Sequence, residues 1–102
     1  MRNALLCLIL FSSSVGADLI GRWYDDVGSP DYLDAKISIN KKGSKYFYHR
    51  TNGDGSQGSF LLIRSGSIYK RADGKFGSVY VVTPKGLEMY DTSGYIRTAR
   101  PN

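Results

Sequence analysis

Short apolar segments separated by turn-forming residues run along the chain from position 19 to its end. Between positions 33 and 40 the odd-numbered residues are Leu, Ala, Ile and Ile, whereas the even-numbered residues are Asp, Lys, Ser and Asn. This period of two predicts a β-strand with one buried face and one polar, outward face. The chain therefore reads as a series of strands, and no segment has the spacing of an amphipathic helix.

Seven further segments rich in β-branched and aromatic residues follow the same pattern. Gly, Pro, Asn or Asp stands in most of the connections between them, where tight reversals need these residues. The predicted strands cover 19–24, 32–40, 45–50, 59–64, 67–71, 76–83, 86–90 and 94–99. Two apolar runs, 60–63 and 79–82, indicate strands that are either covered on both sides or packed against a closed interior.

Short connections require each strand to pair with its neighbours in sequence, which makes an antiparallel meander. Closure of about eight short strands into a barrel removes the exposed edges of such a meander. The predicted fold is therefore all-β, a small antiparallel barrel. Because the strands are short, its interior is expected to be filled by its own side chains.

The first seventeen residues have the features of a cleavable secretory signal peptide. Arg2 is followed by an apolar stretch at 4–11, which is too short to span a bilayer, and by small residues at 15–17. We expect a signal peptide at 1–17, one domain at 18–102, and a secreted or periplasmic location. The single cysteine, Cys7, lies in the leader, so the exported domain is stabilised by packing without a disulfide.

The net charge of the chain is +5, and +4 remains after loss of Arg2 with the leader. This excess either supports solubility or favours an anionic partner outside the cytoplasm: a protein, a glycan or a lipid head group. Export argues against a nucleic acid. Basic and aromatic residues interleave in one stretch, which suits stacking on sugars beside anionic groups. The candidate binding residues there are Lys41, Lys42, Lys45, Tyr46, Tyr48 and Arg50.

Catalytic chemistry has little support in the residue types available. With no cysteine after the leader and only His49, neither a Cys-His pair nor a multi-histidine metal site can form. We expect no cofactor, no metal and no enzymatic activity. Carboxylates crowd the stretch 25–34, either as an ordinary solvated connection or as an acid and base for glycan cleavage. These are Asp25, Asp26, Asp31 and Asp34.

The first predicted strand contains Gly21-Arg22-Trp23, which resembles the G-x-W opening of lipocalins and related up-and-down barrels. In those families the tryptophan closes one end of the barrel, and an arginine from the last strand packs across its ring. The resemblance implies structural roles for Gly21 and Trp23, and for Arg97 or Arg100 as the packing arginine.

A second resemblance lies in the later half of the chain. The segments 65–69 (SGSIY) and 80–86 (YVVTPKG) are similar to paired motifs of the periplasmic and membrane-bound C-type lysozyme inhibitors. That family consists of small exported barrels whose loop serine and lysine enter the lysozyme cleft. The resemblance implies such roles for Ser65 and Lys85, with Tyr69 in the first motif.

The sequence thus predicts an exported binding or inhibitory module that recognises a protein or an anionic envelope component. A lysozyme inhibitor and a small glycan-acting enzyme remain the alternatives.

Overall fold

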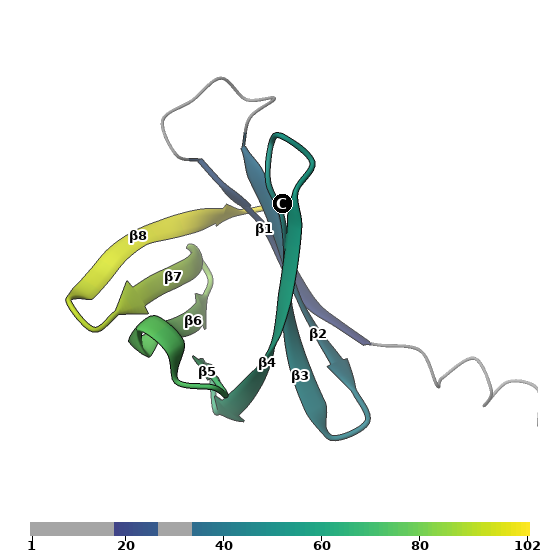
Figure 1. The fold of residues 1–102 in the computed structure, drawn as a ribbon, viewed down its shortest axis with the longest axis vertical. Helices are drawn as coiled ribbons and strands as arrows, with labels where there is room; N and C mark the ends of the chain where they lie inside the picture. Colours follow the sequence, from purple (N-terminus) through teal and green to yellow (C-terminus); the bar gives the residue numbers. More distant parts are fainter. Residues whose placement is uncertain (1–17, 27–33) are drawn as a thin grey trace, which may run out of the picture.

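The computed structural model describes residues 18–26 and 34–102, which form a closed barrel of eight antiparallel strands (Figure 1). Each strand pairs with its neighbour in sequence, and β1 pairs with β8. The strands are β1 (Asp18–Asp25), β2 (Ala35–Lys42), β3 (Lys45–Thr51), β4 (Gln57–Ser65), β5 (Ile68–Arg71), β6 (Val79–Thr83), β7 (Gly86–Asp91) and β8 (Gly94–Pro101). The predicted barrel is confirmed, while the predicted leader lies outside the described residues.

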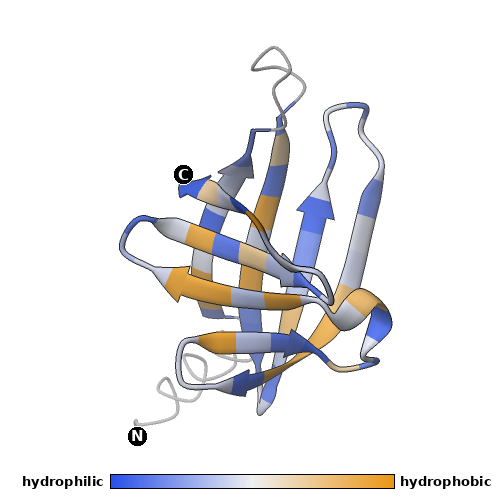
Figure 2. Cartoon of the chain, turned by 90° about the vertical axis from the view of Figure 1, so that its left-hand side faces the viewer, coloured by the Kyte–Doolittle hydropathy of each residue, from blue (hydrophilic) through white to orange (hydrophobic). Residues whose placement is uncertain are grey.

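The alternation that predicted the second strand is visible in the burial of β2. Ala35, Ile37 and Ile39 are buried in the barrel, and Lys36 points outward. Figure 2 shows the same exchange of hydrophobic and hydrophilic residues along the strands. One prediction is wrong, because Asp34 precedes β2 and is buried rather than on the polar face. Leu33, expected on the buried face, lies outside the described residues.

The interior of the barrel is filled by side chains from all eight strands. The buried core consists of Trp23, Ile37, Ile39, Tyr48, Leu62, Tyr69, Tyr80, Leu87, Met89 and Ala99. Three partly buried residues pack against it: Tyr46, Phe60 and Val82. Burial of this apolar surface stabilises a domain whose described residues contain no cysteine.

One strand prediction needs correction. The segment expected as a strand at 76–83 becomes a strand only at Val79, because Phe76 lies in a short 3-10 turn, η2 (Lys75–Gly77), with a φ of 59°. For the apolar run 60–63, the structure agrees with the second alternative, a strand packed on one face against a closed interior. Leu61 and Ile63 are 39% and 58% exposed, whereas Leu62 packs inside.

Gly21 and Trp23 are linked by direct packing in β1. Trp23 is only 4% exposed. A Cβ atom added to Gly21 would lie 2.6 Å from the Cη2 atom of Trp23, closer than any carbon contact allows. A glycine at position 21 therefore lets the indole lie against the backbone of its own strand. The barrel closes beside this ring, where Trp23 pairs with Pro101 and the amide of Asn102 donates to the Arg22 carbonyl at 3.0 Å.

Within the described residues, no helix combines the length and apolar character needed to cross a membrane.

Candidate binding site at the barrel opening

A buried carboxylate holds two arginines together at one end of the barrel. Asp25, the last residue of β1, is 0% exposed. The Nε and Nη2 atoms of Arg97 each donate to one of its oxygens at 2.6 Å, and Nη1 of Arg50 lies 2.7 Å from Oδ2. A fork-to-fork pair of this kind fixes the guanidinium plane. The view of Asp25 as part of a solvated connection is therefore wrong.

The protonation of Asp25 follows from these contacts. Burial alone raises the pKa of its carboxyl group, but hydrogen bonds and charge from Arg97 and Arg50 outweigh burial and hold the pKa below its usual value. Asp25 is thus ionised at neutral pH. One negative charge then faces two positive charges, which leaves this three-residue cluster with a net positive charge.

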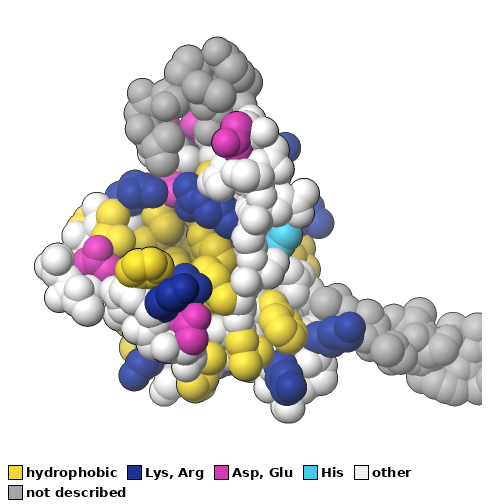
Figure 3. Space-filling view, in the orientation of Figure 1, with side chains coloured by type: hydrophobic (Ala, Val, Ile, Leu, Met, Phe, Trp, Pro, Cys, Tyr) yellow, Lys and Arg dark blue, Asp and Glu magenta, His cyan; other side chains and the backbone are white. Residues whose placement is uncertain are grey.

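Beside the ion pair, the barrel opens into a cavity of about 280 Å³. Figure 3 looks into this opening and shows hydrophobic side chains in the hollow with basic side chains around it. The lining residues come from β3, β4, β5 and the connection between β3 and β4: Tyr48, Arg50, Asn52, Gln57, Gly58, Ser59, Phe60 and Arg71.

Stacked aromatic rings form the wall of this cavity. The ring centroids of Tyr48 and Phe60 are 4.5 Å apart and nearly parallel, and those of Tyr48 and Tyr80 are 4.8 Å apart. The guanidinium of Arg71 lies 4.0 Å from the centroid of Phe60, a cation–π contact. Burial raises the pKa of Tyr80 to about 12 and also raises that of Tyr48, so both phenols stay neutral at physiological pH.

A tight turn between β3 and β4 forms the rim. The amide of Asn52 donates to the Ser56 carbonyl at 2.8 Å, and the Asp54 carboxylate accepts from the amide and hydroxyl of Ser56 at 2.9 and 2.7 Å. The Asn52 side-chain oxygen accepts from Nε of Arg50 at 2.7 Å. Arg50 is therefore held between the turn and Asp25, and its side chain is 24% exposed.

The structure divides the predicted basic and aromatic face between the two sides of the sheet. Tyr48 and Arg50 line the cavity, whereas Phe47 and His49 alternate with them along β3. The Lys42–Lys45 pair lies next to the turn between β2 and β3. A strand sends successive side chains to opposite faces, so a contiguous stretch cannot form one surface.

A second basic and aromatic group lies away from the cavity. Arg64 donates to the Tyr46 hydroxyl at 2.9 Å, and its guanidinium lies 5.5 and 5.9 Å from the ring centroids of Tyr46 and Tyr69. The ammonium of Lys41 lies 5.8 Å from the Tyr46 ring. Three of the candidate binding residues, Lys41, Tyr46 and Tyr69, thus lie close to one another and to Arg64. Arg64 was not among the candidates from the sequence.

The two residues implied by the lysozyme-inhibitor motifs are exposed at strand connections. Ser65 ends β4, and Lys85 lies in the turn between β6 and β7. The Thr83 hydroxyl accepts from the amides of Lys85 and Gly86 at 3.2 Å, which shapes this turn. Connections in an up-and-down barrel alternate between its ends, so both residues belong to the end opposite the Asn52–Ser56 turn.

The arginines expected to pack on Trp23 are bound to carboxylates instead. Arg97 pairs with Asp25, while Arg100 lies 2.8 Å from Asp34 and 4.8 Å from the centroid of the Tyr24 ring. Of the four carboxylates proposed for glycan cleavage, Asp25 and Asp34 are thus ion-paired and buried. Asp31 lies outside the described residues, and Asp26 is at the edge of the described segment.

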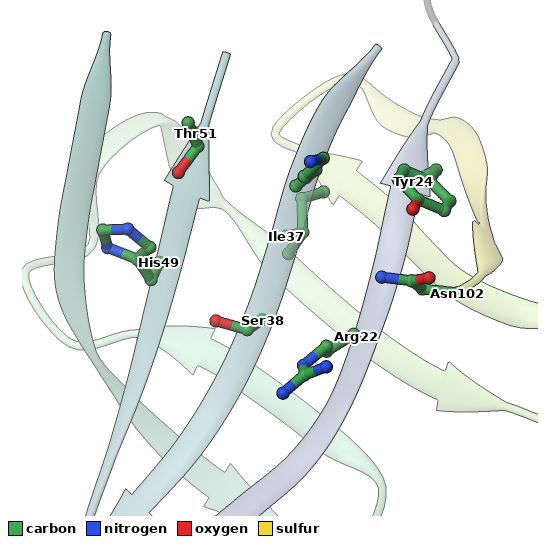
Figure 4. Close-up of a pocket in the computed structure, with 8 residues that line it drawn as sticks. Arg22, Tyr24, Ile37, Ser38, His49, Thr51 and Asn102 are labelled. Atoms are coloured by element: carbon green, nitrogen blue, oxygen red, sulfur yellow. The ribbon is translucent and has the colours of Figure 1, made fainter. Parts of the chain in front are cut away.

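A second cavity, of about 330 Å³, lies on the other side of the sheet (Figure 4). Arg22, Ser38 and His49 are register neighbours across β1, β2 and β3. Nδ1 of His49 lies 2.6 Å from the Ser59 hydroxyl. This groove contains basic groups without the stacked aromatic wall of the barrel opening.

The described residues contain no group of three or more His, Cys, Asp or Glu side chains placed to hold a metal ion.

Fold and site together define an eight-stranded up-and-down barrel with an arginine-lined, aromatic opening. No protein family model matches the chain, and neither a curated protein nor a solved structure is significantly similar to it.

Proposed function

We propose that this protein is an exported, non-enzymatic binding module that takes an anionic group of its partner into the opening of the barrel. The observation that carries the proposal is the position of Arg50 and Arg71 beside the stacked rings of Tyr48 and Phe60, with Arg97 joined to Arg50 through Asp25. Asp25 is shared by two of these arginines, and the partner of Arg71, Asp73, is half exposed to solvent. An incoming carboxylate therefore finds guanidinium donors beside an apolar wall.

The size of the opening limits what it can hold. Pockets that enclose whole small ligands have volumes of roughly 300–1,000 Å³. A cavity of about 280 Å³ with one open side suits a single side chain or head group. The rest of the partner then lies on the barrel rim, as expected for recognition of a protein or an envelope component.

The state of the carboxylates supports binding over catalysis. A general acid needs a pKa raised toward neutrality. The pKa of Asp25 is lowered instead, and Asp34 has one oxygen 2.8 Å from Arg100. Asp25 is thus engaged in holding two arginines rather than poised to donate a proton, and Asp34 is bound to Arg100.

The proposal is tested with phenylacetate, which carries one carboxylate and one ring. We expect binding on the order of millimolar, with shifts of the amide resonances of Tyr48, Phe60 and Arg71 in an NMR titration. Arg71→Gln should weaken binding about three- to tenfold, because it removes a charged donor from the cavity. Arg64→Gln removes the same charge at the Tyr46 and Tyr69 cluster and should leave binding unchanged. Equal losses in both variants would mean that only net charge matters.

We also propose that the protein acts outside the cytoplasm, on the basis of its N-terminal sequence. The chain has Arg2, an apolar stretch at 4–11 and small residues at 15–17, directly before Asp18. N-terminal sequencing of the protein from the extracytoplasmic fraction should begin at Asp18. A chain that still begins at Met1 in that fraction contradicts this proposal.

A further inference from the structure

Within 18–26 and 34–102, one edge of β4 has no partner strand where it borders the cavity. β4 pairs with β3 from Gln57 to Leu62, but with β5 only from Leu62 to Ser65. The amide of Ala72 extends this second pairing by one bond to the Leu61 carbonyl, at 2.9 Å. Among the described residues, no strand pairs with the first four residues of β4 on the side away from β3.

The direction of the free backbone groups follows from the antiparallel pattern. Both backbone groups of a residue point to the same edge, and alternate residues point to opposite edges. Since the Leu61 carbonyl accepts from Ala72, Gln57 and Ser59 also point their amide and carbonyl groups to the open edge. Such an edge is a template for an added strand.

Gly58 provides room for a side chain of the added strand. It lies opposite Arg50 in the β3–β4 register and lines the cavity. A Cβ atom built on Gly58 meets nothing within 4 Å, and its φ is outside the left-handed region. The space is thus open, and a larger residue fits the backbone at this position.

We propose that the free edge of β4 binds an extended acidic peptide segment of a partner protein, one carboxylate of which enters the cavity beside Gly58. This inference rests on the proposed function and names its partner. Strand addition supplies backbone hydrogen bonds, and every second side chain of the peptide points into the barrel opening. The inward side chain opposite Gly58 lies near the guanidiniums of Arg50 and Arg71, which favour a glutamate or aspartate there.

The probe is a capped Thr-Val-Glu-Val-Thr peptide, titrated into the isotope-labelled protein. We expect the amides of Gln57 and Ser59 to shift and to exchange more slowly with solvent, because they gain hydrogen-bond partners. Replacing the central Glu by Gln should weaken binding about tenfold, as should N-methylation of the backbone amides that face β4.

Two substitutions at Gly58 test whether the peptide binds at the free edge of β4 rather than elsewhere on the protein. Gly58→Leu fills the open space and should weaken binding of the glutamate peptide about tenfold or more, whereas Gly58→Ala leaves most of the space and should change it less than threefold. Thermal unfolding of Gly58→Ala should match the wild type, because the added Cβ atom meets nothing within 4 Å, and the same measurement shows whether Gly58→Leu is folded.

The outcomes distinguish the inference from the proposed function. Binding of phenylacetate without binding of the peptide overturns strand addition and leaves the cavity site standing. Equal binding of the peptide and its N-methylated form also overturns strand addition. Peptide shifts confined to the Arg22 and His49 groove contradict the proposed edge, and failure of both probes overturns both proposals.

Discussion

Replacing Asp25 by asparagine is expected to lower the free energy of unfolding by about 2 kcal/mol, since it removes the buried counter-charge that two partly exposed arginines share. The carboxylate is fully buried and makes three short contacts with Arg50 and Arg97. An asparagine of the same size offers only one acceptor oxygen and no charge. The loss should appear in urea unfolding as a lower midpoint.

The matched control is Asp73→Asn. Asp73 pairs with Arg71 at 2.8 Å, but its side chain is 51% exposed. Water replaces such a contact easily, so the expected loss is below about 1 kcal/mol. Equal losses in the two variants would show that burial of Asp25 does not set the strength of its pairing.

The same substitution should change the pH dependence of stability. Because the pKa of Asp25 is lower in the folded protein than in the unfolded chain, the unfolded chain takes up its proton first as pH falls. The stabilisation is fully present above about pH 4, near the unfolded pKa, and is lost as pH falls through the folded pKa. The free energy of unfolding, measured across this pH range, should therefore change less with pH for Asp25→Asn than for the wild type.

Gly86→Ala is the second substitution with a large expected effect. Gly86 has a φ of 145°, and a Cβ atom there would lie 2.1 Å from the backbone carbonyl oxygen of Ala99. Backbone cannot rotate away as a side chain can, so β7 must separate from β8 at the Leu87–Ala99 pair. We expect a loss of at least about 2 kcal/mol from this clash and the strained φ.

Gly58→Ala controls for the loss of glycine itself. It makes the same chemical change in a strand, at a position where nothing lies within 4 Å of the added atom. Its unfolding free energy should remain within about 0.5 kcal/mol of the wild type. If Gly86→Ala behaves in the same way, the close approach of β7 to Ala99 is not a constraint on the fold.

The strand content of this chain could be predicted because its signals are local. The alternation along 33–40 placed Ala35, Ile37 and Ile39 inside, and the turn residues separated eight strands in the right order. Errors arose where a local signal competed with packing. Phe76 is an aromatic residue, a type common in strands, but it lies in a turn with a positive φ. Asp34 falls at a position where the alternation predicts an outward side chain, but it is buried and paired with Arg100.

The candidate site could be predicted only in fragments. Tyr48 and Arg50 were recognised as aromatic and basic, but they were assigned to one face with Lys41, Lys42 and Lys45. Phe60, Arg71 and Gly58 gave no signal, since a strand aromatic, a strand arginine and a strand glycine are common. The two-residue period along 45–50 places Tyr48 and Arg50 on the face opposite Phe47 and His49, and the structure has the same alternation.

The sequence alone determined that the chain forms an antiparallel meander, because hydrophobic period and turn chemistry act over a few residues. Only the tertiary structure decided which charges meet. Asp25 and Arg97 are 72 positions apart and come together because β1 closes onto β8. Among the residues that the structure describes, the first part of β4 has no second partner strand, because β5 is too short to cover it. The opening therefore results from the register between strands that are far apart in the sequence. Local sequence does not determine this register.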